Sequence, residues 1–425
     1  MKISKYSIGI GDRFAHEAGA QLKALLKAKN ELNIDIIPVW NKSNREHNLI
    51  GSNPSDTRNV IQKVIKDAKW QGQYFLDADH INFSNVDRFL TPCDFFTLDV
   101  ADYIGKEATR QEIDSFVAKN EKYIGKLIID GIEPLSISRE FLLHFAKTYL
   151  YATNEAAKLY QYIESKKGKD NFVTEVSMDE VNEPQKPLEL FFILKNLADL
   201  NVPVQTIAPR FTGKFNKGVD YEGDVNAFEK EFEADLLVID YAIKNFGLPE
   251  ELKLSIHSGS DKFSIYPIMG KLIRKYDKGI HLKTAGTTWL EEVIGLSLGT
   301  DEGLDLAKAI YSIAYRRKDE LCAPYATVID IKIEELPDPI ELLKWTGAEF
   351  SEALIHNQHN PRYNSSFRQL IHVAFKVAAE YGPVFIEALE ENRSIIESCV
   401  TDNLYNRHIK RLFIEEEGRY KQLLN

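Results

Sequence analysis

The chain has 425 residues, of which 44% are hydrophobic, and it carries a formal net charge of −11 with an isoelectric point near 5.5. This length is sufficient for one large barrel with additions or for two ordinary domains with buried cores. The acidic balance and the scattered Lys and Arg residues argue against a nucleic-acid partner, because phosphate binding needs a concentrated basic surface.

The cysteine pattern and the hydropathy bear on the cellular compartment. Cys93, Cys322 and Cys399 are far apart and form no C-x-x-C pair, which is typical of a protein in a reducing cytosol. No apolar run approaches the about 18 residues of a membrane-spanning helix, and the N-terminus lacks the apolar core of a signal peptide. We therefore expect a cytoplasmic protein with no membrane partner. The sequence does not decide whether it forms a homo-oligomer.

Short β-rich runs alternate with helical patterns over the first three quarters of the chain, which is typical of a parallel sheet with crossover helices. The predicted strands are Lys5–Ile10, Asp35–Trp40, Gln73–Asp77, Phe95–Val100, Phe172–Ser177, Val202–Ala208, Lys253–His257 and Gly279–Thr284. The predicted helices are Ala15–Lys29, Thr57–Trp70 with Asp56 as its cap, Ser138–Glu164, Pro187–Leu200, Phe228–Phe246, Tyr266–Tyr276 and one that begins near Thr288. Eight alternations over about 290 residues favour an α/β fold of the (β/α)8 TIM-barrel type, with a doubly wound open sheet as the alternative.

Two segments are additions to this barrel. The stretch from Asp102 to about Glu133 follows the fourth predicted strand, is charged and helical, and is expected to form a lid or rim. After about Leu298 the strand signals become sparse, and helical patterns predict a C-terminal α-helical extension. We therefore predict a catalytic barrel domain over residues 1–298 and an extension over residues 299–425 that packs on it. Its last residues, 414–425, are expected to form a solvated amphipathic helix.

The segment 73–80, QYFLDADH, is the most informative part of the sequence, because an apolar strand ends in two carboxylates and an imidazole. In parallel α/β folds the reacting groups lie at the carboxyl ends of the strands. Asp79 and His80 are adjacent, so their side chains diverge if the strand continues. Both can face a central site only if the backbone has already turned.

Two other predicted strands carry histidines near their carboxyl ends. His257 ends the seventh strand, in the run HSGS, and His281 lies on the eighth. Imidazoles from separate rigid elements are common ligands of divalent metals, although any one of these histidines alone would more often be structural. We predict that His80, His257 and His281 together hold a divalent cation. The ligand types do not distinguish Zn²⁺, Mn²⁺, Co²⁺ and Ni²⁺.

Acidic residues on the same strand ends are the predicted catalytic groups. Asp79, beside a metal-bound imidazole, should stay ionised and act as a base, while Glu175, deep on an apolar strand, would hold a proton and act as an acid. The alternatives are that Asp79 orients a metal-bound histidine and that Glu175 forms a structural ion pair.

Basic residues near the same strand ends suit an anionic substrate. Arg210 and Lys214 lie in the run IAPRFTGKFNKG after the sixth strand, and Lys283 lies on the eighth. We predict that Arg210 and Lys283 bind the substrate. The run has no Walker-type spacing, and GIGDRF near the N-terminus has a phenylalanine where a dinucleotide fingerprint requires its third glycine, so bound NAD is not expected.

Six runs together resemble the tagaturonate/fructuronate epimerase family, which comprises metal-dependent barrel enzymes of bacterial hexuronate catabolism. They are FLDADHINF, VTEVSMDE, APRFTGKFNKGVDY, LSIHSGSDKFS, HLKTAGTTWLEE and FRQLIHVAFKVAAEYG. The resemblance spans nearly the whole chain. It implies a small-molecule ketouronate substrate and the interconversion of D-tagaturonate and D-fructuronate.

These two sugars differ at carbon 4, which is not adjacent to the ketone at carbon 2, so simple proton abstraction has no enolate to stabilise it. The missing dinucleotide fingerprint argues against transient oxidation and favours retro-aldol cleavage and re-addition. LDADH and HSGS also resemble the metal-binding segments of class II aldolases, with Ser258 in place of a glycine; this likeness implies that His80 and His257 bind metal and that Asp79 takes the hydroxyl proton. A true aldolase or sugar-acid isomerase on the same barrel and a non-catalytic sugar-acid-binding protein remain the alternatives.

Overall fold

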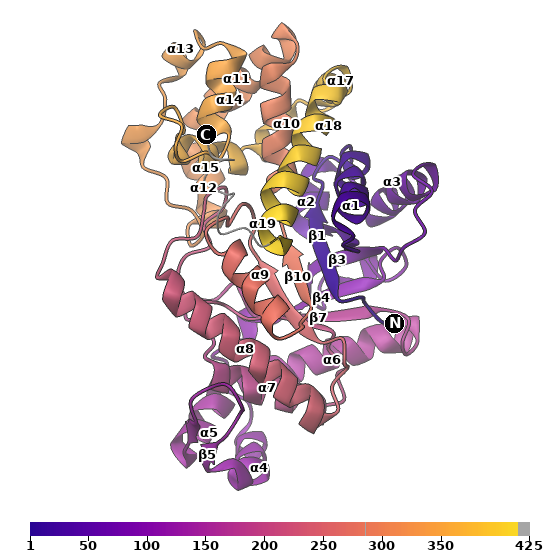
Figure 1. Ribbon diagram of the computed structural model, residues 1–425, viewed down its shortest axis with the longest axis vertical. Helices are drawn as coiled ribbons and strands as arrows, with labels where there is room; N and C mark the ends of the chain where they lie inside the picture. The colour runs from indigo at the N-terminus through magenta and orange to yellow at the C-terminus, as the bar shows by residue number, and fades with distance from the viewer. Residues whose placement is uncertain (285, 415–425) are drawn as a thin grey trace.

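Eight parallel strands close into a barrel in the computed structural model, which describes residues 1–284 and 286–414 (Figure 1). The strands, in order around the ring, are β1 (Tyr6–Gly11), β2 (Ile37–Ser43), β3 (Phe75–Ile81), β4 (Phe95–Asp99), β7 (Val173–Ser177), β8 (Thr206–Ala208), β9 (Lys253–His257) and β10 (Ile280–Lys283). β10 pairs with β1, so the sheet has no edge. The predicted TIM barrel is confirmed, and the open-sheet alternative is wrong.

Helices follow the strands, and most of them cover the outside of the barrel, whereas α2 lies at the cavity described below and α4 and α5 lie in the insertion after β4. The helices are α1 (Ala18–Leu32), α2 (Asn44–Ile50), α3 (Pro54–Asp67), α4 (Arg110–Asn120), α5 (Arg139–Phe145), α6 (Tyr151–Lys167), α7 (Pro187–Asp199), α8 (Val225–Phe246), α9 (Tyr266–Lys275) and α10 (Thr287–Leu298). A π-helical turn over Ala146–Leu150 joins α5 to α6, so the long helix predicted there is present with one irregular turn.

Residues alternate along each strand between the barrel interior and the surrounding helices. The inward positions near the start of β2, β3, β4 and β7 are apolar, and with Ile3 they form a separate core of Ile37, Val39, Phe75, Phe95 and Val173. Toward the carboxyl ends of these strands and on the other strands of the ring, buried inward residues are polar: Ser7, Asn41, Asp77, Thr97, Glu175, Thr206, Lys253, Ser255, His281 and Lys283. The barrel is therefore closed by apolar side chains at one end and becomes polar toward the carboxyl ends of its strands.

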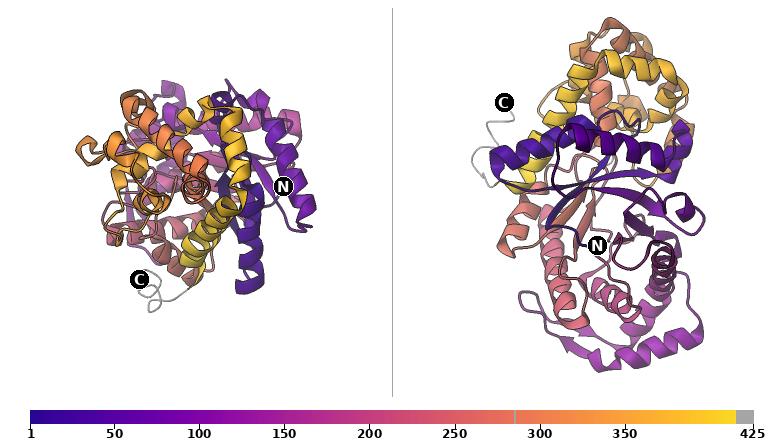
Figure 2. Two further views of the ribbon diagram at one scale, coloured as in Figure 1. Left: turned by 90° about the horizontal axis from the view of Figure 1, so that it is seen from above. Right: turned by 90° about the vertical axis from the view of Figure 1, so that its right-hand side faces the viewer.

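The insertion after β4 lies at the end of the molecule opposite the C-terminal helices, as the right-hand view in Figure 2 shows. It contains α4 and a two-stranded antiparallel sheet of β5 (Gly125–Leu127) and β6 (Leu135–Ile137). None of the residues 102–133 lines the large cavity described below. The prediction that this insertion forms a lid or rim of the site is therefore wrong.

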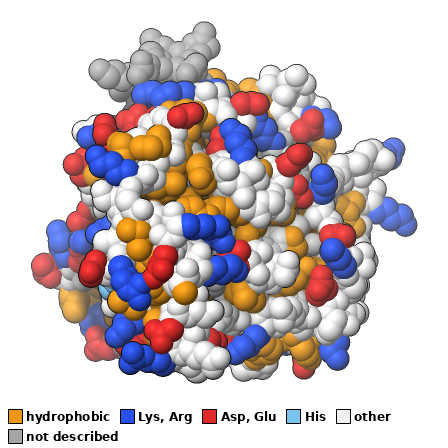
Figure 3. Space-filling view, turned by 90° about the horizontal axis from the view of Figure 1, so that it is seen from below, with side chains coloured by type: hydrophobic (Ala, Val, Ile, Leu, Met, Phe, Trp, Pro, Cys, Tyr) orange, Lys and Arg blue, Asp and Glu red, His pale blue; other side chains and the backbone are white. Residues whose placement is uncertain are grey.

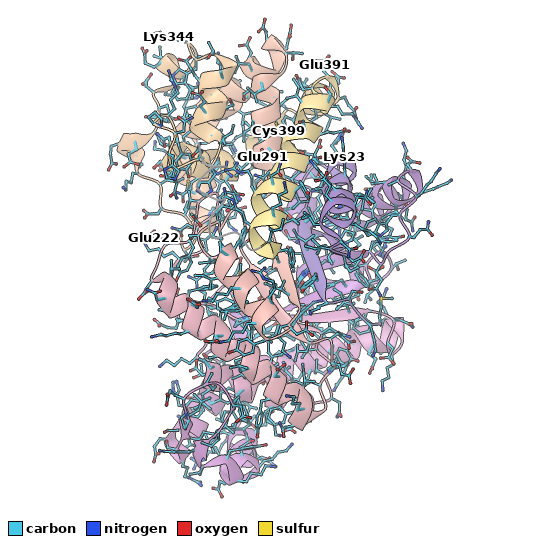
Figure 4. The ribbon with its side chains drawn as sticks, in the orientation of Figure 1. Lys23, Glu222, Glu291, Lys344, Glu391 and Cys399 are labelled. Atoms are coloured by element: carbon cyan, nitrogen blue, oxygen red, sulfur yellow. The ribbon has the colours of Figure 1, made fainter. Side chains whose placement is uncertain are left out.

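The chain after α10 is helical, as predicted, and lies above the barrel in Figure 1. Its helices are α11 (Asp301–Arg316), α12 (Lys318–Cys322), α13 (Pro339–Leu342), α14 (Gly347–Leu354), α15 (Ser365–Val373), α16 (Phe375–Glu380), α17 (Pro383–Glu391), α18 (Arg393–Asp402) and α19 (Lys410–Phe413). All of them except α19 share an apolar core with α10, whose Trp289 and Val293 contribute to it, whereas α19 packs on α9 and joins the core of the barrel. α10 also packs on α18, where Figure 4 labels Glu291 and Cys399. The division at residue 298 stays a prediction, and residues 415–425 of the expected amphipathic end lie outside the described residues.

A buried ion pair connects the C-terminal helices to the loops of the barrel. Arg368 on α15 donates from Nη2 to Asp261 Oδ2 at 2.8 Å and from Nε to the carbonyl of Gly218 at 2.5 Å, and both side chains of the pair are fully buried. His356 and His408 lie 3.3 Å from the same carboxylate. This cluster holds the loops after β8 and β9 against α15.

Charged side chains of both signs are interspersed across the face that Figure 3 shows, which is the lower end of the molecule in Figure 1. Among the described residues, no helix has both the length and the apolar character needed to cross a membrane.

Candidate active site

The end of β3 is irregular at the two residues that the sequence singles out. His80 has a φ of 53°, and the pairing of β3 with β4 shifts register between Ala78 and Ile81. Such a bulge redirects a side chain that regular alternation would point outward. For this reason Asp79 and His80 both line the same cavity, although they are adjacent in the sequence.

His80 and His257 face a common carboxylate, that of Asp179 just after β7. One ligand atom from each of the three residues lies within 4.8 Å of the other two. Asp179 Oδ1 is 3.6 Å from His80 Nε2 and 3.1 Å from His257 Nδ1, but neither contact has hydrogen-bond geometry. Two buried ring nitrogens are therefore left without a hydrogen-bond partner among the described residues.

The other nitrogen of each ring is bonded to a carboxylate. His80 Nδ1 lies 2.9 Å from Asp79 Oδ1, and His257 Nε2 lies 2.9 Å from Glu175 Oε1. An ionised carboxylate only accepts, so these nitrogens carry the protons and donate them. The lone pairs of neutral rings would then be on the nitrogens that face Asp179. This is how imidazoles are held as metal ligands, so His80, Asp179 and His257 fit a divalent cation such as Zn²⁺ or Mn²⁺.

The field at this point favours positive charge. Burial alone would lower the pKa of His257, but the carboxylates of Asp179 and Glu175 outweigh it and raise that pKa to about 9. Burial opposes ionisation of Asp179, yet His257 and His80 hold its pKa well below the ordinary range. A cation bound by the three residues would take the place of the protons that the imidazoles otherwise attract.

The structure does not bring His281 to this group. Its ring is fully buried inside the barrel, where Nδ1 lies 2.8 Å from Ser7 Oγ, and the ring packs on Phe95. Burial lowers the pKa of His281 to about 3, so the ring is neutral. His281 points inward one step before Lys283 along β10, and it does not line the cavity. Asp179 occupies the third position that the sequence had assigned to His281.

Lys283 lies at the centre of a buried group of carboxylates. Its Nζ is 2.8 Å from Asp77 Oδ2, 3.0 Å from Asp79 Oδ1 and 2.9 Å from Glu175 Oε1. Gly9 on β1 makes room for this side chain, because a Cβ there would come within 2.5 Å of Lys283 Cγ. Gly9, the first glycine of the GIGDRF run, therefore leaves space for the side chain of Lys283 inside the barrel.

The carboxylates around Lys283 differ in protonation. Burial raises the pKa of Asp77 to about 7, although Lys283 works against it. Burial acts in the same sense on Asp79 and Glu175, but there Lys283 and a histidine prevail and lower both pKa values. The structure thus leaves Asp79 ionised, as expected. Glu175 has a lowered pKa too, which does not fit the acid role expected for it, and Asp77 is the carboxylate of this group whose pKa is raised.

A cavity of about 680 Å³ opens above this group at the carboxyl ends of the strands. Asp79, His80, Asp179, Arg210, His257 and Lys283 line it, whereas Glu175 is fully buried beneath. Lys214 is exposed and pairs at 2.9 Å with Glu222, which Figure 4 labels near the left edge of the view. Of the basic residues predicted near the site, Arg210 and Lys283 therefore reach the cavity and Lys214 does not.

Several residues that line the cavity come from segments other than the strand ends. Tyr325, Val328 and His372 reach the cavity from the C-terminal helices and the loops between them, Lys217 comes from the loop after β8, and Arg13 from the loop after β1. Asp179 could have been found, because it stands two residues after β7 in the run VTEVSMDE. Lys217 belongs to the basic run IAPRFTGKFNKG, whereas Tyr325, Val328 and His372 are brought to the barrel mouth by the fold.

Comparison with known proteins agrees with this architecture. Residues 1–412 match the family described as tagaturonate epimerase. A tagaturonate/fructuronate epimerase of Thermotoga maritima is 27% identical over 436 residues, which is 95% of this chain and 79% of that protein. Crystal structures of fructuronate-tagaturonate epimerase UxaE from Cohnella laeviribosi share the fold. A glycerol complex gives a TM-score of 0.79 at 24% identity and covers 97% of this chain and 82% of that one. The native form gives a TM-score of 0.78 at 23% identity and covers 97% of this chain and 82% of that one. Because the family match covers nearly the entire sequence, this chain belongs to the tagaturonate epimerase family.

Proposed function

We propose that this chain interconverts D-tagaturonate and D-fructuronate, using a divalent cation held by His80, Asp179 and His257. The observation that carries the proposal is the pair of imidazoles that each donate one N–H to a carboxylate and turn the other nitrogen toward Asp179. Family membership supports the substrate pair. The cavity above the three residues has room for a six-carbon sugar acid.

The chemistry follows from the position of the inverted carbon. Carbon 4 carries a hydroxyl and is joined to carbon 3, which is next to the ketone. Loss of the hydroxyl proton and cleavage of the bond between carbons 3 and 4 give a three-carbon aldehyde acid. The electron pair of the broken bond passes to the enediolate of the other three-carbon fragment. Rotation of the aldehyde and reversal of both steps form the same bond on the opposite face, so the reaction consumes no oxidant and no reductant.

The residues have separate roles in this scheme. A bound divalent cation would polarise the ketone oxygen and so favour the enediolate. Asp79 is ionised and lines the cavity, so it takes the proton from the carbon-4 hydroxyl and returns it, and the neighbouring Lys283 keeps it ionised. Glu175 does not reach the cavity; it orients His257 through the bond to Nε2. Arg210 lines the cavity, where its guanidinium contacts oxygen atoms of the substrate.

Removal of metal tests the role of the three ligands. We expect that dialysis against a strong chelator abolishes the conversion of tagaturonate and that adding back Zn²⁺, Mn²⁺, Co²⁺ or Ni²⁺ restores it, as followed by chromatography of the two ketouronates. Metal content measured on the same samples shows whether removal is complete. Full activity in samples free of metal would overturn the metal role.

The fate of the hydrogen on carbon 4 tests the retro-aldol route. We expect tagaturonate labelled with deuterium at carbon 4 to give fructuronate that retains the label in ordinary water, because the C–H bond of the aldehyde is never broken. Mass spectrometry of the product measures retention. Loss of deuterium to solvent would contradict cleavage, and accumulation of free three-carbon products would instead indicate an aldolase.

A further inference from the structure

One wall of the cavity contains a buried imidazole that the proposed mechanism does not use. His372 on α15 is 2% exposed and lines the cavity, and neither of its ring nitrogens has a hydrogen-bond partner among the described residues. Its ring lies against Gly286, where a Cβ would come within 1.9 Å of Nε2. A neutral imidazole offers one donor and one acceptor, so this side chain is equipped for a polar ligand that enters the cavity.

The start of α10 lies beside this imidazole. Gly286 is the N-cap of α10 and, as a glycine, has no side chain that could cap the helix. It lines the cavity together with Gly259, which follows β9. The N–H of Gly286 donates to the carbonyl of Gly259 at 2.9 Å, so the loops after the last two strands of the barrel meet here. A helix N-terminus favours negative charge, and in TIM barrels the loops after the last two strands often bind an anion.

Two cations complete the surroundings. Lys217 lines the cavity, and no carboxylate lies within ion-pair distance of its ammonium in the described part of the chain; its Nζ lies 5.5 Å from the ring centroid of Tyr325. Arg13 donates from Nη1 to the carbonyl of His372 at 3.0 Å and pairs with Glu46 at 3.1 Å. Glu180 also lines this cavity, and its field reaches Lys217.

The charges near His372 also favour an anion. Burial lowers the pKa of His372 well below its ordinary range, and the charged groups that add most to this effect are the cations Arg13, Lys217, Arg368 and Lys262. The ring is therefore neutral in a positive environment, and an anion placed there would be attracted by several groups at once.

We propose that His372, Lys217 and the N-terminus of α10 form the subsite for the carboxylate of the hexuronate. This assignment rests on the proposed function and gives the carboxylate to Lys217 in place of Lys283, whose ammonium is already surrounded by three carboxylates. The carboxylate carbon is two bonds from carbon 4. Its anchor would therefore hold the aldehyde fragment in the cavity while that fragment rotates.

The test is a kinetic comparison of Lys217→Met with Lys214→Met, which removes an exposed lysine of the same loop that pairs with Glu222 outside the cavity. Lys217→Met is expected to raise KM for tagaturonate by about 10- to 100-fold, the range for loss of a hydrogen bond to a charged group, with a smaller change in kcat. Lys217→Arg should recover most of the affinity because it keeps the charge. Lys214→Met should behave as the wild type.

Inorganic sulfate separates this inference from the proposed function. Sulfate should bind the wild type and Lys214→Met, as measured by calorimetry, and at least tenfold more weakly to Lys217→Met. An unchanged KM in a folded Lys217→Met enzyme would overturn the subsite while leaving the epimerase proposal intact. Sulfate binding that depends on Lys217, in a protein that does not convert tagaturonate, would keep the anion subsite and overturn the proposed function.

Discussion

Replacement of Lys283 by methionine is expected to reduce kcat by about 100- to 10,000-fold, the range for loss of a general base. It should also lower the free energy of unfolding by about 3–5 kcal/mol, as is typical when one partner of a buried ion pair is removed. The reason is the number of carboxylates that depend on this ammonium. Asp77, Asp79 and Glu175 all lie within 3.0 Å of Lys283 Nζ, so the variant leaves buried negative charge without a counter-ion. Asp79 would then bind a proton and cease to act as a base.

A matched control is available inside the same barrel. Lys253 is as buried as Lys283, at 3% exposure, but its Nζ donates to the carbonyl of Ser4 and burial lowers its pKa to about 7. Lys253→Met should lose only about 1 kcal/mol of stability, the contribution of one hydrogen bond, and keep its kcat. Denaturant unfolding and steady-state kinetics measure both quantities. A second change, Asp77→Asn, should restore part of the stability of Lys283→Met but none of its activity; wild-type kcat in Lys283→Met would contradict the proposed role.

Substitution of Asp179 by asparagine is the second change with a large expected effect. The amide has the same size as the carboxylate but removes the negative charge that faces both free imidazole nitrogens. Loss of a residue that only hydrogen-bonds to a metal ligand typically lowers metal affinity by about 10- to 100-fold. Because Asp179 is itself a proposed ligand, we expect a larger fall in metal affinity and a loss of activity at low metal concentration. Metal content after dialysis, determined by mass spectrometry, and rates over a series of metal concentrations measure the two effects.

Glu183→Gln is the control for this substitution. Glu183 is exposed on the same loop after β7 and does not line the cavity, so the loss of its charge should leave metal binding and rate unchanged. Normal metal content together with a normal rate in Asp179→Asn would show that the ion is held elsewhere.

The barrel could be predicted because its strands are buried on the outside face by helices and carry continuous apolar patterns. All eight predicted strands are present, and the boundaries differ most where polar residues continue into the barrel. β2 and β3 extend to Ser43 and Ile81, beyond the predicted ends at Trp40 and Asp77, because Asn41 and Asp79 point to the polar interior instead of to a solvated loop. At α3 the N-cap is Asn53, and Asp56, predicted as the cap, is the third residue of its capping box.

The site could be predicted in part for the same reason. Residues at strand ends, such as Asp79, His80 and His257, reach the cavity because the topology places all strand ends on one rim. His281, the third predicted ligand, does not reach the cavity because it is the inward-facing residue before Lys283 on β10 and so lies deeper in the barrel. This position depends on the register of the strands around the ring, which the sequence does not give. The basic loop after the sixth strand was expected near the rim, but which of its lysines enters the cavity, and that His372 joins it from a distant helix, depends on tertiary packing.

Tyr325, Val328 and His372 give the cavity a wall that does not belong to the barrel. The groups proposed to make and break bonds come from strand ends and adjoining loops, whereas part of the surface that a long substrate would touch comes from residues more than forty positions further along the sequence. Variation at Tyr325 and Val328 can therefore alter which sugar acids fit without displacing the reacting groups. Laboratory evolution for new sugar acids would do best to randomise these two positions and to leave the strand ends and the Arg368–Asp261 ion pair unchanged.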